Sequence, residues 1–449
     1  MSWLSLLPPV LAIVLAIWKR EVILALLVAI FAAEVLLHGF NPLRGFLATL
    51  DRITAVFANT SNAQILLFST LVGALLALMR HAHGVSAFVR ALLKAGLARS
   101  PRSAAMLTAL LGLVIFIETY LSALAVGTFA QSLFDRHGMS RARLAFFVDT
   151  TCSPVSVLIL LNGWGAFVLG LLQGYGIDNP VSTLIASIPL NFYALAILAL
   201  LFYTAWTGRV HGALRAHERD LPAAAAQDAG DTHGKARYFL LPLATLVFGI
   251  VGFMLYTGDG ALIAGNGSAS VLYSVCVALL LTWALLRRDR IDTHAALVKV
   301  AFVGMGDLLP IVTTLLLAFA FGSSLQELGT GTLFASMISG ALPLWLIAPV
   351  IFLSACGISF TTGTSWGTFA ILIPVAIPLA LTTGLPPPLL LAAVLGGGVF
   401  GDHCSPISDS TILASLASDC DHLIHVRTQL PYALAAGGVA LLLFTLASL

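Results

Sequence analysis

Charged side chains are scarce in this chain. Only 9% of its 449 residues are Asp, Glu, Lys or Arg, whereas soluble domains carry about 25%. Apolar residues make up 59% of the chain, and the mean hydropathy is +1.00. The formal net charge of +2 argues against nucleic acid as a partner, because nucleic-acid binding requires a marked excess of positive charge. The composition therefore predicts an integral membrane protein whose partner is the lipid bilayer.

Motifs for metals, disulfides and cofactors are also lacking. The five cysteines have no spacing typical of a metal site or a disulfide framework, and they lie in or beside apolar segments: Cys152, Cys276, Cys356, Cys404 and Cys420. The glycine run 396–398 is not followed by the Lys-Ser or Lys-Thr pair of a phosphate-binding loop. We therefore expect buried free thiols, no resident cofactor and no enzymatic activity.

Long apolar runs divide the chain into crossings, since a helix needs about 20 apolar residues to span a bilayer. We predict ten full crossings, near 3–18, 22–39, 63–79, 144–174, 181–205, 238–256, 269–286, 300–322, 388–418 and 431–448. Lys and Arg gather in five loops, which we place in the cytoplasm: 19–20, 80–102, 136–143, 209–237 and 287–290. The polar stretch 206–237 reads as a cytoplasmic linker between two halves.

Two further apolar segments have polar centres and read as re-entrant hairpins, at 104–133 and 342–382. Their sequences align: Tyr120, Ser122, Gly127, Thr128 and Phe129 correspond to Phe360, Thr362, Gly367, Thr368 and Phe369. Each of the repeats 1–205 and 238–449 contains one hairpin and five crossings. Because five is an odd number, the second repeat is inserted with the opposite orientation to the first. The predicted fold is therefore all-α and polytopic, built as an inverted repeat.

One short motif occurs in both halves. Residues 151–156 read TCSPVS and residues 403–408 read HCSPIS, each within an apolar stretch. A proline in a membrane helix removes a backbone hydrogen bond and frees carbonyl groups, so Pro154 and Pro406 predict one broken helix per half. Paired breaks of this kind point to the binding site of a secondary transporter.

The few ionisable groups within apolar segments are candidates for that site, since such groups are costly in a bilayer. We predict that cation, proton or substrate is bound by carboxylates, His403 and hydroxyls at the breaks and hairpin bends, namely Glu118, Thr119, Asp149, Thr150, Thr151, Ser153, Thr362, Ser365, Asp402, His403, Ser405, Ser408 and Asp409. Sodium prefers oxygen ligands and is placed at Asp149, Asp402 and Asp409. Alternatively, Asp149 is interfacial, His403 is a hydrogen-bonded core residue, and Asp307 caps the eighth crossing.

Several of these segments resemble the NhaC family of sodium/proton antiporters. The most specific match is GDHCSPISDSTILAS at 401–415 with DHLIHVRTQLPYAL at 421–434. ETYLSALAVGTF at 118–129, SRARLAFFVDTTCSPV at 140–155, ELGTG at 327–331 and GTSWGTF at 363–369 are also similar. The resemblance implies alternating-access transport by a homodimer in the cytoplasmic (inner) membrane of a prokaryote, with the Asp, Glu, Ser and Thr residues at the breaks as ligands.

The chain departs from the family pattern at a few positions. Thr119 stands where a second acid is usual, Cys152-Ser153 replaces two alanines, and Phe319 replaces an Ala-Trp pair. Sodium/proton antiport remains the leading prediction. The alternative, favoured by the missing acid, is a sodium- or proton-coupled carrier of a small organic solute such as an amino acid or a carboxylate. An ion channel is disfavoured, since paired breaks in inverted halves suit alternating access.

The loop charges give a topology that labelling can test. Single cysteines introduced at Arg90, Lys235 and Arg288 should react with a membrane-impermeant maleimide only from the cytoplasmic side. Cysteines within 257–266 should react only from outside, because those residues follow a crossing that begins at the basic linker. Labelling of positions 90 and 141 from opposite sides would contradict the re-entrant hairpin at 104–133.

Overall fold

Every regular element described by the computed structural model is a helix. The described residues are 3–19, 21–85, 87–88, 91, 98–116, 119–159, 161–173, 175, 177, 179–219, 234–261, 265–330, 333 and 343–449. The all-α prediction is therefore confirmed for these residues.

The first half of the chain holds many short helices. They are η1 (Trp3–Leu6), α1 (Leu7–Lys19), α2 (Val22–Leu37), α3 (Pro42–Ala55), η2 (Val56–Ala58), α4 (Thr60–His81), α6 (Pro101–Val114), α7 (Thr119–Arg136), α8 (Arg141–Ser156), α9 (Gly163–Gln173), α10 (Pro180–Ser187), α11 (Phe192–Thr207) and α12 (Gly212–Arg219).

The second half holds longer helices. They are α13 (Arg237–Thr257), α14 (Gly267–Arg288), α15 (His294–Glu327), η4 (Leu344–Leu346), α17 (Ile347–Thr362), α18 (Ser365–Thr383), α19 (Pro387–Cys404), α20 (Asp409–Ala417) and α21 (His422–Ala447).

Membrane spans are numerous, as predicted. Eight helical segments among the described residues are long and apolar enough to cross a membrane, and α19 with α20, bent by 51°, makes a ninth. Helices α1 and α2 are apolar but have 13 and 16 residues, fewer than the roughly 20 of a usual span, so the crossings at 3–18 and 22–39 stay predictions. The segment 144–174 is divided between α8 and α9, beside the predicted break at Pro154.

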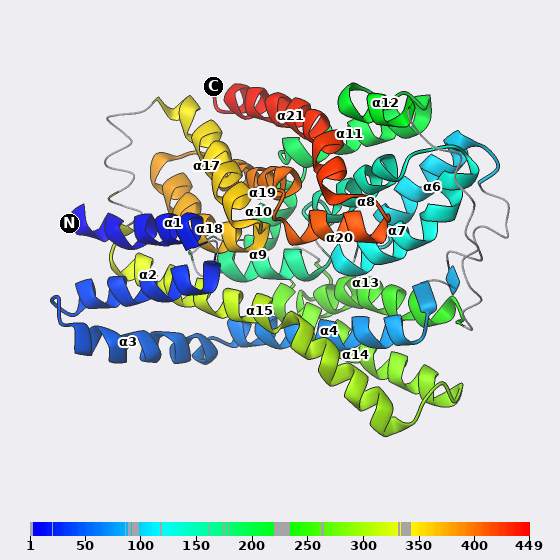
Figure 1. Cartoon of the computed structure of the whole chain (residues 1–449). Helices are drawn as coiled ribbons and strands as arrows, with labels where there is room; N and C mark the ends of the chain where they lie inside the picture. The colour runs from blue at the N-terminus through cyan, green and yellow to red at the C-terminus, as the bar shows by residue number, and fades with distance from the viewer. Residues whose placement is uncertain are drawn as a thin grey trace.

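Each segment predicted as a hairpin contains two helices, but α17 (with η4) and α18 are each long enough to span a membrane, so the re-entrant course stays a prediction. Helix α6 ends at Val114 and α7 begins at Thr119, while α17 ends at Thr362 and α18 begins at Ser365. Figure 1 shows α6 with α7 at one side of the molecule and α17 with α18 at the opposite side. Gly363 makes the second turn in the left-handed conformation, with φ of 69°, which favours glycine. That the two halves form an inverted repeat stays a prediction.

Both breaks lie close to their prolines. Helix α8 ends two residues after Pro154, and Pro406 lies between α19 and α20. At the first break Asn162 donates its Nδ2 to the Ser156 carbonyl at 3.0 Å and accepts the Gly165 amide at 3.0 Å, which caps α9. Backbone groups freed by each break thus find partners, as an apolar environment requires.

The described residues of the predicted linker pack against the helices. Helix α12 lies within 206–237, and α11 extends two residues into that segment. The Tyr432 hydroxyl accepts the His211 amide at 2.7 Å, and Glu218 Oε1 lies 3.6 Å from the guanidinium of buried Arg143. These contacts join α12 to α8 and α21, and the role of 206–237 as a linker stays a prediction.

An ion-pair cluster joins α2, α3 and α15. Glu34 is 1% exposed, and its Oε1 accepts Arg52 Nε at 2.7 Å and the Ser324 hydroxyl at 2.8 Å. Arg52 also contacts Glu327 at 2.5 Å and Ser323 at 3.2 Å. Removing one partner of a buried ion pair leaves the other charge buried without a partner, which is costly. The cluster therefore holds these three helices in a fixed orientation to one another.

A second cluster of charged side chains joins the start of α13 to the end of α14. The carboxylate of Asp289 accepts hydrogen bonds from the Tyr238 hydroxyl and the Arg237 guanidinium, and Lys235 Nζ lies 3.4 Å away. These hydrogen bonds, first that from Tyr238, lower the pKa of Asp289 to about 2. The carboxylate therefore stays ionised at any physiological pH.

Helices α4 and α15 cross at two glycines. A Cβ added at Gly73 would collide with the backbone of Gly304, and a Cβ at Gly304 would collide with the backbone of Gly73 and with Ala77. The two helices therefore touch backbone to backbone, a contact that only glycine permits.

This crossing predicts a difference between two neighbouring glycines of α15. Gly304→Ala should lower stability by about 1–3 kcal/mol, because the methyl group must push the closely packed helices away from each other. Gly306→Ala has nothing within 4 Å to collide with and should leave stability unchanged or higher, since alanine favours helix. Thermal unfolding in detergent compares the two variants. Equal midpoints would contradict the close crossing.

Candidate functional site

A cavity lies where the hairpins and the broken helices meet. It holds about 600 Å³ of empty space, some of it open to the exterior. Its lining residues come from eight helices: Ser69, Val72, Thr119, Ser153, Gly163, Trp164, Leu308, Ile311, Trp366, Asp402, Asp409 and Ser410. Segments from both halves of the chain thus contribute to one site.

Asp402, near the end of α19, is held by three serine hydroxyls. Its Oδ1 accepts Ser408 at 2.6 Å, and its Oδ2 accepts Ser365 at 2.7 Å and Ser410 at 3.4 Å. The side chain is only 2% exposed. The hydroxyls come from the first turn of α18, the break and the first turn of α20. The carboxylate is therefore fixed where three chain segments converge on the cavity.

The local sequence explains this arrangement. Pro406 cannot continue α19, and Ser408 caps α20 by accepting the Thr411 amide at 3.3 Å. The Ser405 hydroxyl donates to the Phe360 carbonyl at 2.7 Å, which fastens the break to the tip of the second hairpin. The serines of the HCSPIS motif thus satisfy backbone groups and the carboxylate together.

Asp149 forms a second, fully buried carboxylate site in α8. Its Oδ2 accepts Gln429 Nε2 at 2.6 Å and the Thr411 hydroxyl at 3.0 Å. The Nε2 atoms of His403 and His425 lie 3.7 and 3.8 Å from the same oxygen. Its Oδ1 has no hydrogen-bond partner among the described residues. Asp149 is fully buried and is not among the lining residues of the cavity.

His403 belongs to the buried network beside Asp149. Its Nδ1 lies 2.7 Å from the Tyr193 hydroxyl and its Nε2 lies 3.4 Å from Thr150 Oγ1. Its carbonyl accepts Gln429 Nε2 at 2.7 Å, which satisfies a group freed at the end of α19. The histidine is hydrogen-bonded and fully enclosed, as one of the two alternatives predicts.

The structure divides the predicted site residues into groups. Thr119, Ser153, Asp402 and Asp409 line the cavity, and Ser365 and Ser408 bond to Asp402. Asp149, Thr150 and His403 form the buried network. The hydroxyls of Thr151, Thr362 and Ser405 donate to backbone carbonyls outside the cavity lining. Glu118 lies outside the described residues.

Asp307 is not a helix cap. Helix α15 begins at His294, so Asp307 lies in its middle, where its Oδ2 contacts Arg80 of α4 at 3.3 Å. The prediction placed the start of this crossing at 300, six residues late, because the polar first turn of α15 lacks the apolar residues by which a span is recognised. The pair is exposed at both side chains and adds little stability.

Sequence reasoning missed several residues of the two carboxylate sites. They are Tyr193, Ser410, Thr411, His425 and Gln429. Gln429 and His425 stand in the motif 421–434 on which the resemblance rests, and a buried amide within a specific motif was the available signal. Tyr193 had none, because an aromatic residue in an apolar helix is ordinary.

The comparisons with known proteins agree with this architecture. The model of the Na+/H+ antiporter family matches residues 144–449. The chain belongs to this family. An uncharacterized protein of Haemophilus influenzae is 32% identical across 96% of this chain and 88% of its own. The Malate-2H(+)/Na(+)-lactate antiporter of Bacillus subtilis is 45% identical across 22% of each chain, and the arginine/ornithine antiporter ArcD of Halobacterium salinarum 34% across 23% and 21%.

Solved transporter structures share the fold. The YdaH transporter of Alcanivorax borkumensis superposes with a TM-score of 0.61 at 15% identity, covering 90% of this chain and 88% of that one. MtrF of Neisseria gonorrhoeae gives a TM-score of 0.58 at 14% identity, covering 90% and 84%. The family match and the apolar helices make the chain a multi-pass secondary transporter of the kind found in prokaryotic inner membranes.

The carboxylates of the cavity should be essential for coupled transport. Asp402→Asn and Asp409→Asn should abolish it while the protein remains in the membrane, because an amide offers no charge to a cation. Asp307→Asn, the matched control, should only weaken transport, since that carboxylate lies in an exposed ion pair. Ion flux in proteoliposomes with equal amounts of each variant measures the effect. Full activity of the first two variants would remove Asp402 and Asp409 from the site.

Proposed function

We propose that the protein exchanges sodium for protons, with Asp402 as the carboxylate that binds them alternately. One observation carries the proposal. A carboxylate that is only 2% exposed, oriented by three serine hydroxyls, lies in the wall of a cavity to which two broken helices and both predicted hairpins contribute. Oxygen ligands of this kind suit sodium.

The cavity supplies further oxygen ligands beside Asp402. Asp409 brings a second carboxylate from the start of α20, and Ser410 brings a hydroxyl from the same turn. A proton or a sodium ion each neutralises the carboxylate, so binding of one excludes the other. Because a bare charge is costly within a membrane, the site would move only when it is occupied, which couples the two fluxes.

The proposed sodium site has fewer carboxylate ligands than the sequence predicts. Asp149 Oδ2 accepts the N–H of Gln429 and the hydroxyl of Thr411, and an N–H donor so close to the carboxylate would repel a cation. We therefore assign sodium to Asp402 and Asp409. Asp149 would position α20 and α21 against α8 through Thr411 and Gln429.

The architecture suggests how access would alternate. The halves 1–205 and 238–449, joined by 206–237, would act as two opposed repeats, and broken helices would present the site to each side in turn. A homodimer would provide a fixed scaffold for this movement. Sodium and protons would be cargo, and no resident cofactor is required.

One observation favours the second candidate, a sodium- or proton-coupled carrier of a small organic solute. Trp164 and Trp366 line the cavity with their ring centroids 4.9 Å apart. An ion needs no aromatic surface, whereas sites for organic molecules are built from apolar and aromatic side chains with a few polar groups.

Flux measurements decide between the two functions. In proteoliposomes containing a pH-sensitive dye, external sodium without any organic solute should change internal pH, and lithium and potassium serve as comparisons. An Asp402→Asn protein reconstituted in parallel shows whether the change depends on the site. Sodium that produces no pH change, with organic solute taken up only under an ion gradient, would replace antiport by the carrier function.

A further inference from the structure

Two histidines of α21 meet at one serine hydroxyl of α20. Ser415 Oγ lies 3.0 Å from His422 Nδ1 and 2.8 Å from His425 Nδ1. Ser415 and His425 are buried, whereas His422 is half-buried at the start of α21. The three side chains therefore connect the surface of the protein with its interior.

The second ring nitrogen of each histidine faces an atom that can only accept a hydrogen bond. His422 Nε2 lies 2.7 Å from the Pro406 carbonyl oxygen, and His425 Nε2 lies 2.9 Å from Gln429 Oε1. The orientation of the Gln429 amide is fixed, because its Nε2 donates to the His403 carbonyl at 2.7 Å. Each of the two histidines that contact Ser415 must therefore carry a proton on Nε2.

One hydroxyl cannot satisfy two neutral imidazoles. A neutral histidine with its proton on Nε2 has only a lone pair on Nδ1, so His422 and His425 would both need the single proton of Ser415. That proton can also go to the Thr411 carbonyl, which lies 2.7 Å away and has no proton to give. At least one Nδ1 lone pair would then face a lone pair of Ser415 Oγ across 3.0 Å or less. One additional proton removes this conflict, because it turns one Nδ1 into a donor.

With the additional proton on His422, the hydrogen bonds all run in one direction. His422 donates to Ser415, and Ser415 donates to His425. His425 donates to Gln429, which donates to Asp149 Oδ2 at 2.6 Å. The chain of hydrogen bonds thus begins at a half-buried imidazole and ends at a fully buried carboxylate.

The same chain lets the proton move inward through the hydroxyl. Ser415 Oγ takes the proton of His422 Nδ1, while the former Ser415 proton passes to His425 Nδ1. The hydroxyl is restored, His422 is left neutral and His425 becomes an imidazolium. Its Nε2 lies 3.8 Å from Asp149 Oδ2, and this carboxylate compensates the buried positive charge.

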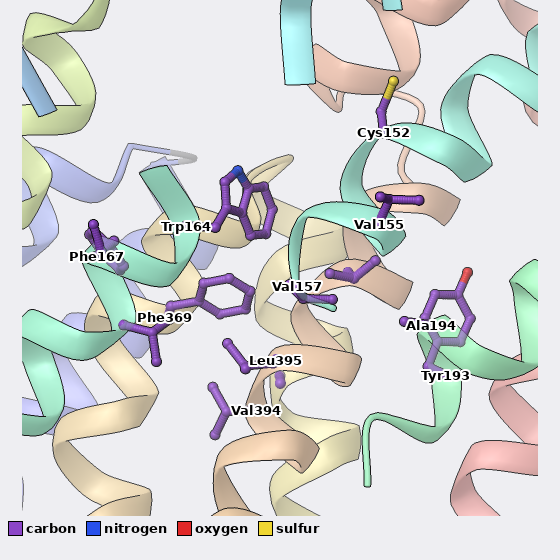
Figure 2. Packing of buried hydrophobic residues seen from close by; sticks show 14 of the residues in the cluster. Cys152, Val155, Val157, Trp164, Phe167, Tyr193, Ala194, Phe369, Val394 and Leu395 are labelled. Carbon is purple, nitrogen blue, oxygen red and sulfur yellow. The ribbon is translucent and has the colours of Figure 1, made fainter. Parts of the chain in front are cut away.

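The inner end of the chain is enclosed. Figure 2 shows Tyr193, which contacts His403, among buried apolar side chains that include Val155 and Val157. The titratable or charged groups on the surrounding elements include Arg141 and Asp149 of α8, Tyr193 of α11, His403 of α19, Asp409 of α20 and Asp421 at the N-cap of α21. Asp149 is the carboxylate of this set that lies within 4 Å of His425, so it balances a charge that enters along the chain.

The outer end of the chain lies on the side that the loop charges assign to the cytoplasm. Arg141, in the basic loop 136–143, donates to the Ser418 carbonyl at 3.3 Å. Ser418 follows the last residue of α20, four positions before His422.

We propose that His422, Ser415 and His425 form a proton relay, which takes up one proton at the cytoplasmic surface and holds it beside Asp149. Ser415 lies on α20, the helix that begins at Asp409, so proton uptake acts on a helix of the proposed sodium site. The inference rests on the proposed function, since it names a route for the protons exchanged there. It adds residues that do not line the cavity.

Nitrogen NMR of the purified wild-type protein, labelled with nitrogen-15 in its histidines, tests the shared proton. At a pH of about 7, where imidazoles titrate, both Nε2 atoms should carry a proton, and one proton should be shared between the Nδ1 atoms of His422 and His425. His422→Gln and His425→Gln assign the signals. A bare Nε2 on either histidine, or two bare Nδ1 atoms, would overturn the proposal.

Ser415→Ala removes the hydroxyl through which the proton passes. At alkaline pH, where protons are scarce, it should slow the sodium-evoked pH change in proteoliposomes at least about tenfold. The loss should shrink as the pH falls, because abundant protons compensate for slower transfer. A loss by the same factor at every pH would show a purely structural role, and wild-type flux at every pH would show none; either result contradicts the relay.

Thr428→Val is the matched control. The Thr428 hydroxyl is also buried, and like that of Ser415 it donates to a carbonyl one helical turn earlier, at 2.9 Å. Valine removes this hydroxyl without touching the relay, so the pH profile of flux should keep its wild-type shape. Thermal unfolding shows that each variant is folded.

The two experiments separate this inference from the proposed function. A shared proton in the NMR spectrum of a protein without sodium-evoked pH change would refute antiport and support the proton site. A sodium-evoked pH change in a protein with two bare Nδ1 atoms would refute the relay and leave antiport intact.

Discussion

The whole structure depends on one constraint: backbone groups freed inside an apolar environment must be hydrogen-bonded by neighbouring segments. Ser405 bonds the Phe360 carbonyl, Asn162 bonds the Ser156 carbonyl, and Gln429 bonds the His403 carbonyl. The bonds of Ser405 and Gln429 join the second break to α17 and α21, whereas the Asn162 bond lies within the first break. The second break therefore depends on the assembled fold, which also brings side chains from both breaks to one cavity.

The same bonds create two unlike carboxylate sites. Among the described residues, the Asp402 carboxylate accepts hydrogen bonds from serine hydroxyls alone and borders the cavity, whereas Asp149 accepts one from the Gln429 amide and does not line the cavity. A hydroxyl oxygen can turn toward a cation, but an amide N–H cannot accept one. Thr411 bonds Asp149 and lies 3.4 Å from the Asp402 carbonyl, so the two sites share one helix, α20. Movement of α20 would change the hydrogen bonds of both carboxylates.

Sequence patterns predicted the regions of the fold that local composition controls. The helix pairs at 104–133 and 342–382 and the break at Pro406 appear close to their expected positions, because apolar runs interrupted by proline, glycine and hydroxyls are local signals. The N-terminal crossings stay predictions, since hydropathy reports that α1 and α2 are apolar but not whether 13 or 16 residues reach across a bilayer. The start of α15 was missed because its first turn is polar.

For the site, composition and the repeated motif by themselves determined that this is a helical membrane transporter with Asp402 and its serines at a break. Tertiary structure alone decided which carboxylate borders a cavity and which is enclosed. Gln429 lies 280 residues from Asp149, and Thr411 lies 262 residues from it. Hydrogen bonds between such distant residues depend on how helices pack, and no periodicity along the chain encodes them.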